Sequence, residues 1–327
     1  MSVLLPVRAG NDWLLAAVAS ILDQTLRDLE LIVIDDGDNQ GVLPRLPPDP
    51  RLRIVRSAGR GIVAALNSGA AAARGLLLAR MDADDLALPE RLQQQVELLE
   101  REPAVGIVGA RVEIFTDSGP PRDGYRRYQD WLNGLTEPEA IRRELYVESP
   151  IPHPTAMLGR SLFARLGGYR DRPWAEDYDL WLRADAAGVA MAKPAPVLLH
   201  WRDHPQRLSR SQGRYDLTGF TRAKAHFLAR TRLRERAAVI WGACPTGARL
   251  FDALRDEGVT VGGFIDIDPK KIGGRKRGLP VWPPTAATET GDALILGAVG
   301  AHGARASIRA ALQALDRQEG RDFLFTA

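Results

Sequence analysis

The sequence LLLARMDADDLALPERL, residues 76–92, places three aspartates between an apolar run and the start of a helix. Residues 76–79 have the composition of a short buried strand, and Pro89 is typical of a first helical turn. The acids between them, here called the aspartate triad, are Asp82, Asp84 and Asp85. Three carboxylates crowded at the carboxyl end of a strand repel one another unless something cationic lies among them.

The chain before this stretch repeats the same order of strand and helix. Apolar runs at residues 1–7 and 29–34 and a third expected strand, LRIVRS at residues 52–57, are separated by helical patterns, and an alanine-rich helical pattern precedes residue 76. Strands without polar alternation, separated by helices, indicate a parallel sheet covered on both faces. In such sheets ligands bind beyond the carboxyl ends of the strands. The aspartate triad and the pair Asp35–Asp36 both fall at those ends, which marks that edge as the candidate site.

Each acidic cluster has two interpretations. The triad either caps the helix that begins near Pro89, for which one aspartate suffices, or binds a divalent cation together with water and a diphosphate. The surplus of carboxylates favours the cation. Asp35 and Asp36 either form the turn before Gly37 or accept hydrogen bonds from a nucleobase N–H and a ribose hydroxyl.

Length and composition bound the class of protein. A chain of 327 residues, 45% hydrophobic and 26% charged, is long enough for two globular domains. A net charge of only +3 gives no reason to expect a nucleic-acid partner. The single cysteine, Cys244, excludes an internal disulfide, and we find neither a secretory signal nor a membrane-length apolar run. We therefore expect a cytoplasmic protein, with peripheral contact at the inner face of the membrane left open.

The middle of the chain is less regular. The sequence VGIVGARVEIF, residues 105–115, indicates a strand pair, and residues 117–128 have the composition of a polar loop. A helical pattern returns around residues 137–146. We expect ligand specificity to reside in the irregular segments at residues 117–128 and 200–211.

The composition resets near residue 237, where VIWGACPTGARL begins a new strand, glycine turn and helix. We expect a first domain at residues 1–212, a helical connector at 213–236 and a second domain at 237–327. The second resembles the nucleotide-binding half of Rossmann-like domains, including those found beside sugar acyltransferases, with Asp266 ending its second strand. Cys244 occupies the position of the middle glycine of that fingerprint, where a side chain crowds a pyrophosphate. Two roles stay open: a structural or partner-docking domain, and a module that binds a nucleotide or nucleotide-sugar.

Four separated motifs together resemble the family 2 glycosyltransferases with the GT-A fold. They are SVLLPVRAGNDWLLAAVASILDQTLRDLELIVIDDGD, ALNSGAAAARGLLLARMDADDLALPERLQQQVELLE, HPTAM and GGYRDRPWAEDYDLWLR, in the family's order over about the first 210 residues. The resemblance implies an inverting enzyme that uses Mn²⁺ or Mg²⁺ and a nucleotide-sugar, most commonly a UDP-sugar. The acceptor would be a glycan or small-molecule hydroxyl, as in polysaccharide biosynthesis. The absence of membrane-length segments favours non-processive transfer.

On the donor side, the resemblance implies that Pro6 and Val7 end the first strand where the nucleotide is received. Asp36 matches the aspartate that reads the nucleobase, with Asp35 beside it. Asp82 and Asp84 match the family's Asp-x-Asp, which holds the ribose and the metal ion against the diphosphate. Asp84 is the first choice as metal ligand, and Asp85, the third member of the triad, is a candidate helper.

On the acceptor side, the resemblance implies that Asp177, in the sequence AEDYD, is the general base, with Glu176 as its neighbour. Displacing a nucleoside diphosphate builds negative charge on the leaving group, which a cation stabilises, while a carboxylate removes the proton of the attacking hydroxyl. Without the other motifs, the same acids would be an acidic first turn of a helix. A sugar-nucleotidyltransferase and a non-catalytic nucleotide-sugar sensor remain as alternatives.

The segment HWRDHPQRLSRS, residues 200–211, matches a loop that closes over the donor diphosphate in family members. Its candidates are Arg202, His204 and Arg207, and a merely solvated loop is the alternative. Two positions depart from the family pattern: Arg8 stands where many members carry an aromatic residue, and Asp38 where serine or threonine is common. Both lie on the nucleotide side, so the base is left open.

Overall fold

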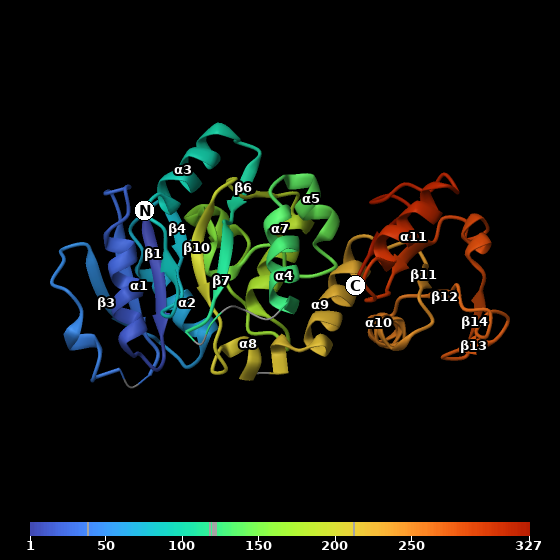
Figure 1. The fold of residues 1–327 in the computed structure, drawn as a ribbon, viewed down its shortest axis with the longest axis horizontal. Coiled ribbons are helices and arrows are strands. Elements are labelled where there is room, and N and C mark those ends of the chain that lie inside the picture. Colours follow the sequence, from blue (N-terminus) through green and yellow to red (C-terminus); the bar gives the residue numbers. More distant parts are fainter. Residues whose placement is uncertain (38, 118, 120–122, 212) are drawn as a thin grey trace. The chain divides into compact units, whose positions relative to one another are not determined.

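The structure is a computed structural model that describes residues 1–37, 39–117, 119, 123–211 and 213–327 (Figure 1). Asp38 and part of the predicted loop at 117–128 therefore lie outside the described residues. The chain forms two compact units: the first comprises Met1–Arg142, Pro150–Arg172 and Asp179–Ser211, and the second Arg143–Ser149, Pro173–Tyr178 and Gln212–Ala327. The domain limits expected at residues 212 and 237 stay a prediction, because these units are defined by contacts rather than by independent folding.

The first unit is built on a mixed sheet with strand order β3-β2-β1-β4-β8-β6-β9. Its strands are β1 Ser2–Val7, β2 Glu30–Asp35, β3 Leu52–Arg56, β4 Leu77–Arg80, β6 Val105–Val108, β8 Met157–Gly159 and β9 Ala190–Ala192. The pairs β1–β2, β2–β3 and β1–β4 are parallel, as predicted from their unbroken apolar runs, whereas β8 is antiparallel to β4 and β6. The carboxyl ends of β1, β2 and β4 consequently meet at one edge.

Both faces of this sheet are buried. Val3 and Leu5 of β1 share a core cluster with Leu14 of α1 Asp12–Leu22. The other face packs against α2 Ile62–Ala72 so closely that a Cβ on Gly69 would lie 2.7 Å from Ile34 Cδ1. This explains why the strands are apolar at consecutive positions rather than at alternate ones.

A small second sheet has the order β5-β10-β7 and carries the loop that follows β10. Its strands are β5 Leu86–Ala87, β7 Arg111–Phe115 and β10 Val197–Arg202. The strand pair predicted within residues 105–115 is wrong: β6 pairs with β8 and β9, and β7 pairs with β10 in the other sheet. Consecutive strands separated by a short turn need not pair when each has a longer-range partner.

The remaining helices of the first unit connect these strands. They are α3 Arg91–Arg101, α4 Asp123–Gly134, α5 Pro138–Glu144, α6 Arg160–Arg165, α7 Glu176–Ala186 and α8 Leu208–Ser211, of which α5 and α7 extend into the second unit. The polar loop predicted up to residue 128 is partly wrong, because α4 begins at Asp123. Tyr125, Tyr128 and Leu132 recur at helical spacing and pack on the core. The polar residues around these three positions hide the helical spacing in the sequence.

The second unit contains a sheet with strand order β13-β14-β12-β11-β15-β16. Its elements are β11 Ala238–Trp241, β12 Val261–Ile265, β13 Arg275–Lys276, β14 Leu279–Trp282, β15 Leu294–Gly297, β16 Phe323–Phe325, α9 Leu217–Arg230, α10 Pro245–Asp256 and α11 Ala304–Gln313. The predicted strand, glycine turn, helix and strand are present as β11, α10 and β12. Gly247 is required here, since a Cβ would lie 2.0 Å from the Gly242 carbonyl oxygen. Within the described ranges, every helix is too short or too polar to cross a bilayer.

Candidate active site

The nucleotide side of the site begins where β1 and β2 end. Val7 is in register with Asp35, and the Asp36 amide donates to the Val7 carbonyl at 2.8 Å. Behind them lies Asn39, only 2% exposed, whose Nδ2 donates to Asp35 Oδ1 at 2.5 Å and to the Val7 carbonyl at 3.2 Å. Its Oδ1 accepts from the Gly10 amide at 2.7 Å. Asn39 thus ties the ends of both strands together, a role that sequence reasoning missed.

Asp36 has a structural partner of its own. Both carboxylate oxygens accept from the Gly61 amide, at 3.1 and 3.0 Å, immediately before α2. Negative charge at a helix N-terminus is favourable there. Asp36 remains partly exposed, so its predicted contact with a nucleobase stays a prediction that this hydrogen bond does not prevent.

The aspartate triad converges in space. One ligand oxygen of each of Asp82, Asp84 and Asp85 lies within 4.8 Å of the others. Burial, reinforced by Asp82, raises the pKa of Asp84; burial and both neighbouring carboxylates raise the pKa of Asp85 well above its usual range. Asp85 Oδ2 is buried and has no hydrogen-bond partner among the described residues. An orphaned carboxylate oxygen beside two others is the donor set that a hard divalent cation takes.

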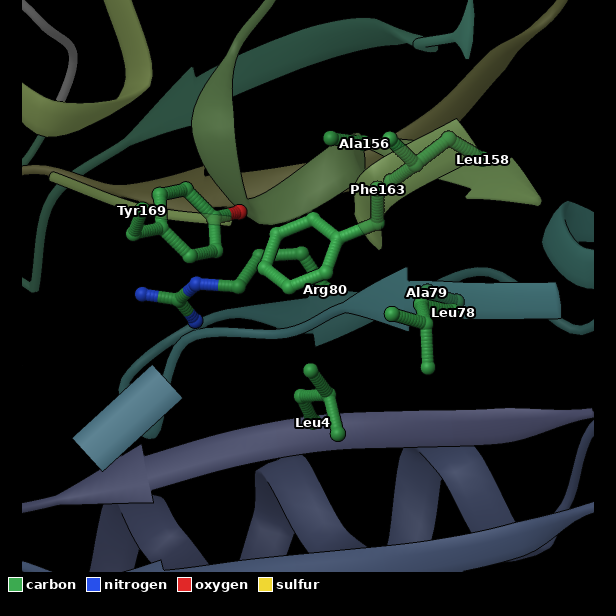
Figure 2. A pocket seen from close by; sticks show the side chains of 8 residues that line it. All are labelled: Leu4, Leu78, Ala79, Arg80, Ala156, Leu158, Phe163 and Tyr169. Carbon is green, nitrogen blue, oxygen red and sulfur yellow. The ribbon is translucent and has the colours of Figure 1, made fainter. Parts of the chain in front are cut away.

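Two arginines flank the triad. Arg80 Nη2 lies 2.5 Å from Asp82 Oδ1, and Arg91, which is fully buried, donates to the Arg80 carbonyl. Burial lowers the pKa of Arg91 to about 10, so it still carries its charge at neutral pH. Figure 2 shows the Arg80 stem crossing a small apolar pocket, with Phe163 and Tyr169 beside it. Neither arginine was singled out from the sequence, because each is separated from the acids it faces by apolar residues.

The end of β10 and the loop after it contact the triad through Arg202 and His204, and their predicted contact with a donor diphosphate stays a prediction. The Arg202 amide donates to Asp85 Oδ1 and its Nε to the Asp84 carbonyl, each at 2.8 Å. His204 Nε2 lies 2.7 Å from Asp84 Oδ2. The charge of Arg207 lowers the pKa of both Asp84 and Asp85, which places it near the same carboxylates. The solvated-loop alternative does not describe these contacts.

An aromatic residue braces this loop from α1. The Trp13 ring lies 4.8 Å from the His204 ring and 4.9 Å from the Arg202 guanidinium carbon. Phe115, at the end of β7, lies 4.5 Å from the same guanidinium carbon. Cation–π contacts of this kind favour one orientation of the arginine. Sequence reasoning missed Trp13, although an aromatic residue so soon after the first strand was a usable signal.

The predicted base lies in the second unit. Glu176 is 2% exposed and accepts a hydrogen bond from the Tyr215 hydroxyl, which belongs to the 3₁₀ turn Gly213–Tyr215. Asp177 is partly exposed, and burial together with Glu176 and Glu148 raises its pKa to about 8. A carboxylate with that pKa is a competent general base near neutral pH. A shared pocket of Asp177 and the triad stays a prediction.

Comparison with known proteins then decides the family. Residues 2–167, just over half of the chain, match the family model described as glycosyl transferase family 2. The chain belongs to glycosyl transferase family 2. This confirms the resemblance inferred from the four motifs, and the matched range includes the whole aspartate triad.

Curated relatives of this glycosyltransferase agree. An uncharacterized glycosyltransferase from Haemophilus influenzae is 28% identical over 64% of this chain and 67% of its own length. The amylovoran biosynthesis glycosyltransferase AmsE of Erwinia amylovora is 28% identical over 66% of this chain and 85% of its own length. Among solved structures, S. aureus TarS 1–349 in complex with UDP-GlcNAc superimposes with a TM-score of 0.57 at 15% identity, covering 78% of this chain and 71% of TarS 1–349. This likeness supports the GT-A fold.

Proposed function

We propose that this family 2 glycosyltransferase moves a sugar from a nucleotide-sugar, a UDP-sugar in the first instance, to an acceptor hydroxyl with inversion at the anomeric carbon. The observation that carries the proposal is the aspartate triad covered by Arg202 and His204, with one buried carboxylate oxygen left unpartnered. UDP is favoured because the TarS structure of similar fold was solved with UDP-GlcNAc.

The triad fits a divalent cation, and Asp84 with Asp82 would hold it. Mn²⁺ or Mg²⁺ bound there would stabilise the negative charge that develops on the departing diphosphate. The chain's own residues supply the rest of that side: Arg202 and Arg207 carry positive charge beside the triad, and His204 fixes Asp84. Asn39 holds Asp35 where the nucleoside is expected.

Asp177 is the proposed base. Its ionised carboxylate would take the proton of the attacking hydroxyl, which must approach the face of the sugar opposite to the leaving diphosphate for inversion. Glu176 is buried and bonded to Tyr215, so it is placed to orient its neighbour rather than to reach the acceptor.

The acceptor is proposed by class only. AmsE is named for amylovoran biosynthesis, which favours a glycan acceptor and a place in polysaccharide assembly. Transfer of one sugar per encounter and action in the cytoplasm, with peripheral contact at the membrane, remain predictions from the sequence.

The test is to incubate the whole chain with a panel of nucleotide-sugars and Mn²⁺ and to measure free nucleoside diphosphate, with and without chelator. Chelator-sensitive release of UDP, increased by a glycan acceptor, is expected. Release of pyrophosphate from a sugar 1-phosphate and a nucleoside triphosphate would instead indicate nucleotidyl transfer. Donor binding with no release under any condition would indicate a sensor.

A further inference from the structure

A short segment before the base belongs to the second unit rather than the first. This segment, Arg143–Ser149, precedes the C-terminal sheet by the 88 residues 150–237, yet Val147 packs against the core cluster of that sheet. Lys224 of α9, which is 8% exposed, donates from Nζ to the Val147 carbonyl at 2.7 Å and to the Thr326 carbonyl at 2.9 Å. One buried lysine therefore joins the segment to Thr326, the residue that follows β16.

A second attachment comes from α11. Arg305 Nη1 donates to Glu144 Oε2, and Arg309 Nη2 lies 3.6 Å from Glu144 Oε1. The Glu144 side chain is only 10% exposed, whereas the side chains of Arg305 and Arg309 are 32% and 27% exposed, so water screens these ion pairs in part. Removing Arg305 would take from this mostly buried carboxylate one of its cationic partners.

The other side of the segment faces the base. The Tyr178 hydroxyl, one residue after Asp177, donates to the Leu145 carbonyl at 2.7 Å. Glu148 is close enough that its charge contributes to the raised pKa of Asp177. The segment thus contacts helix α11 through Glu144 and the core of the C-terminal sheet through Val147, and it contacts the base region through Leu145 and Glu148.

We propose that the C-terminal part of the second unit, residues 217–327, contributes to sugar transfer: by holding segment 143–149 it positions the base Asp177. Arg305 and Lys224 are the positioning residues. The inference rests on the proposed function, in which Asp177 is the base. It gives the C-terminal unit a structural role in the same enzyme and requires no ligand of its own.

The C-terminal glycine turn is consistent with such a role. Asp266 Oδ2, where a Rossmann-like site would bond a ribose, accepts from the Ala243 amide at 2.9 Å and from Lys271 Nζ at 3.1 Å. The Cys244 thiol donates to the Ala298 carbonyl. These groups are already satisfied within the fold, whereas the contacts to segment 143–149 lead directly to the base.

The charges around the base make the coupling measurable. Burial raises the pKa of Glu148, and the neighbouring Lys224 ammonium opposes that rise. Asp177 is faced by Glu176 and Glu148, and the pKa of the Tyr215 hydroxyl is raised by burial and by Glu176. Moving Glu148 away from Asp177 removes one repelling charge, so the base should titrate at lower pH.

The test compares Arg305→Met with Arg321→Met in the full chain. Arg321 is 64% exposed and pairs with Asp322 in the same unit, so Arg321→Met controls for losing an ion pair there. We expect Arg305→Met to lower kcat for sugar transfer by roughly tenfold or more, because a misplaced base is poorly aligned. Its acidic pH limb should move to lower pH, with the Kd for the donor unchanged. Arg321→Met should match the parent in all three.

If Arg305→Met matches Arg321→Met in kcat and in the pH limb, the inference is overturned. Should Arg305→Met fail to fold, Lys224→Met takes its place: a lowered kcat with a limb shifted to lower pH supports the coupling, and a match to Arg321→Met in both readouts overturns it. Asp177→Asn separates this inference from the proposed function. Full turnover in that variant removes the base assignment itself, whereas lost turnover beside an unaffected Arg305→Met removes only the role of the C-terminal sheet.

Discussion

The Tyr215 hydroxyl donates a 2.7 Å hydrogen bond to the carboxylate of Glu176, the residue that precedes the proposed base. Burial and the adjacent Glu176 raise the pKa of this phenol, so Tyr215 keeps its proton and stays a donor at every working pH. Glu176 is therefore fixed as an acceptor, and Asp177 is the more exposed carboxyl group of the pair. Two adjacent acids thus acquire different roles from their surroundings.

Asp84→Ala should abolish both sugar transfer and donor hydrolysis while leaving the melting temperature close to that of the parent. The variant removes the central carboxylate of the triad, and losing charge stabilisation at a developing anion costs on the order of 10²–10³ in rate. Release of nucleoside diphosphate measures the effect. Asp130→Ala, on the exposed side of α4, is the matched control and should keep parental activity. Full, chelator-resistant activity of Asp84→Ala would remove the metal assignment.

The pH dependence of transfer should follow Asp177. Its pKa of about 8 means that kcat/KM rises with pH and levels off above about 8, because only the ionised carboxylate accepts a proton. Stability should change in the opposite direction. A carboxyl whose pKa is raised on folding holds its proton more tightly when folded, so its contribution to stability declines as pH rises from about 4 to 8.

Asp177→Asn tests both halves of that prediction. The amide does not ionise, so this variant should bind donor normally, lose turnover, and gain in melting temperature relative to the parent as pH increases from 5 to 9. If the melting temperatures of Asp177→Asn and the parent changed in parallel with pH, the assigned pKa of Asp177 would be contradicted. A parental kcat/KM that does not change with pH around pH 8 would contradict it as well.

Trp13→Ala should weaken donor binding more than it slows the chemical step. The ring braces His204 and Arg202 over the triad, and such contacts contribute about 1–2 kcal/mol, or roughly tenfold in donor KM. Trp13→Phe keeps an aromatic face and should recover most of the loss. A donor KM that does not change in Trp13→Ala would show that the loop holds its position without α1.

Asn39→Ala should destabilise the nucleotide edge. The buried amide bonds Asp35, Val7 and Gly10, and leaving such partners unsatisfied costs about 1–3 kcal/mol in the free energy of unfolding. Urea unfolding measures that cost, and calorimetry with UDP measures the accompanying loss of affinity. Asn39→Asp keeps one acceptor but places a charge beside Asp35, so it should be at least as destabilising.

Sequence patterns predicted the fold and the acidic residues of the candidate site. They did not predict the residues that hold those acids in place. Consecutive apolar positions in β1 and β2 identified a doubly covered sheet, and acids at strand ends predicted which of its edges binds a ligand. Asn39, Trp13 and Tyr215 were missed because each makes contacts across 20 or more residues of chain, for which no local periodicity exists. The same limit produced the false pairing of β6 with β7, since a strand's partner is set by tertiary packing.

The chain order of the second unit has a practical consequence for engineering. Exchanging the tail of one such enzyme for that of a relative at a single junction near residue 212 would leave residues 143–149 and 173–178 facing a foreign scaffold. Chimeras intended to redirect sugar addition would have to transplant all three pieces together. Libraries of recombined sequences should accordingly yield active hybrids only when those distant stretches share a parent.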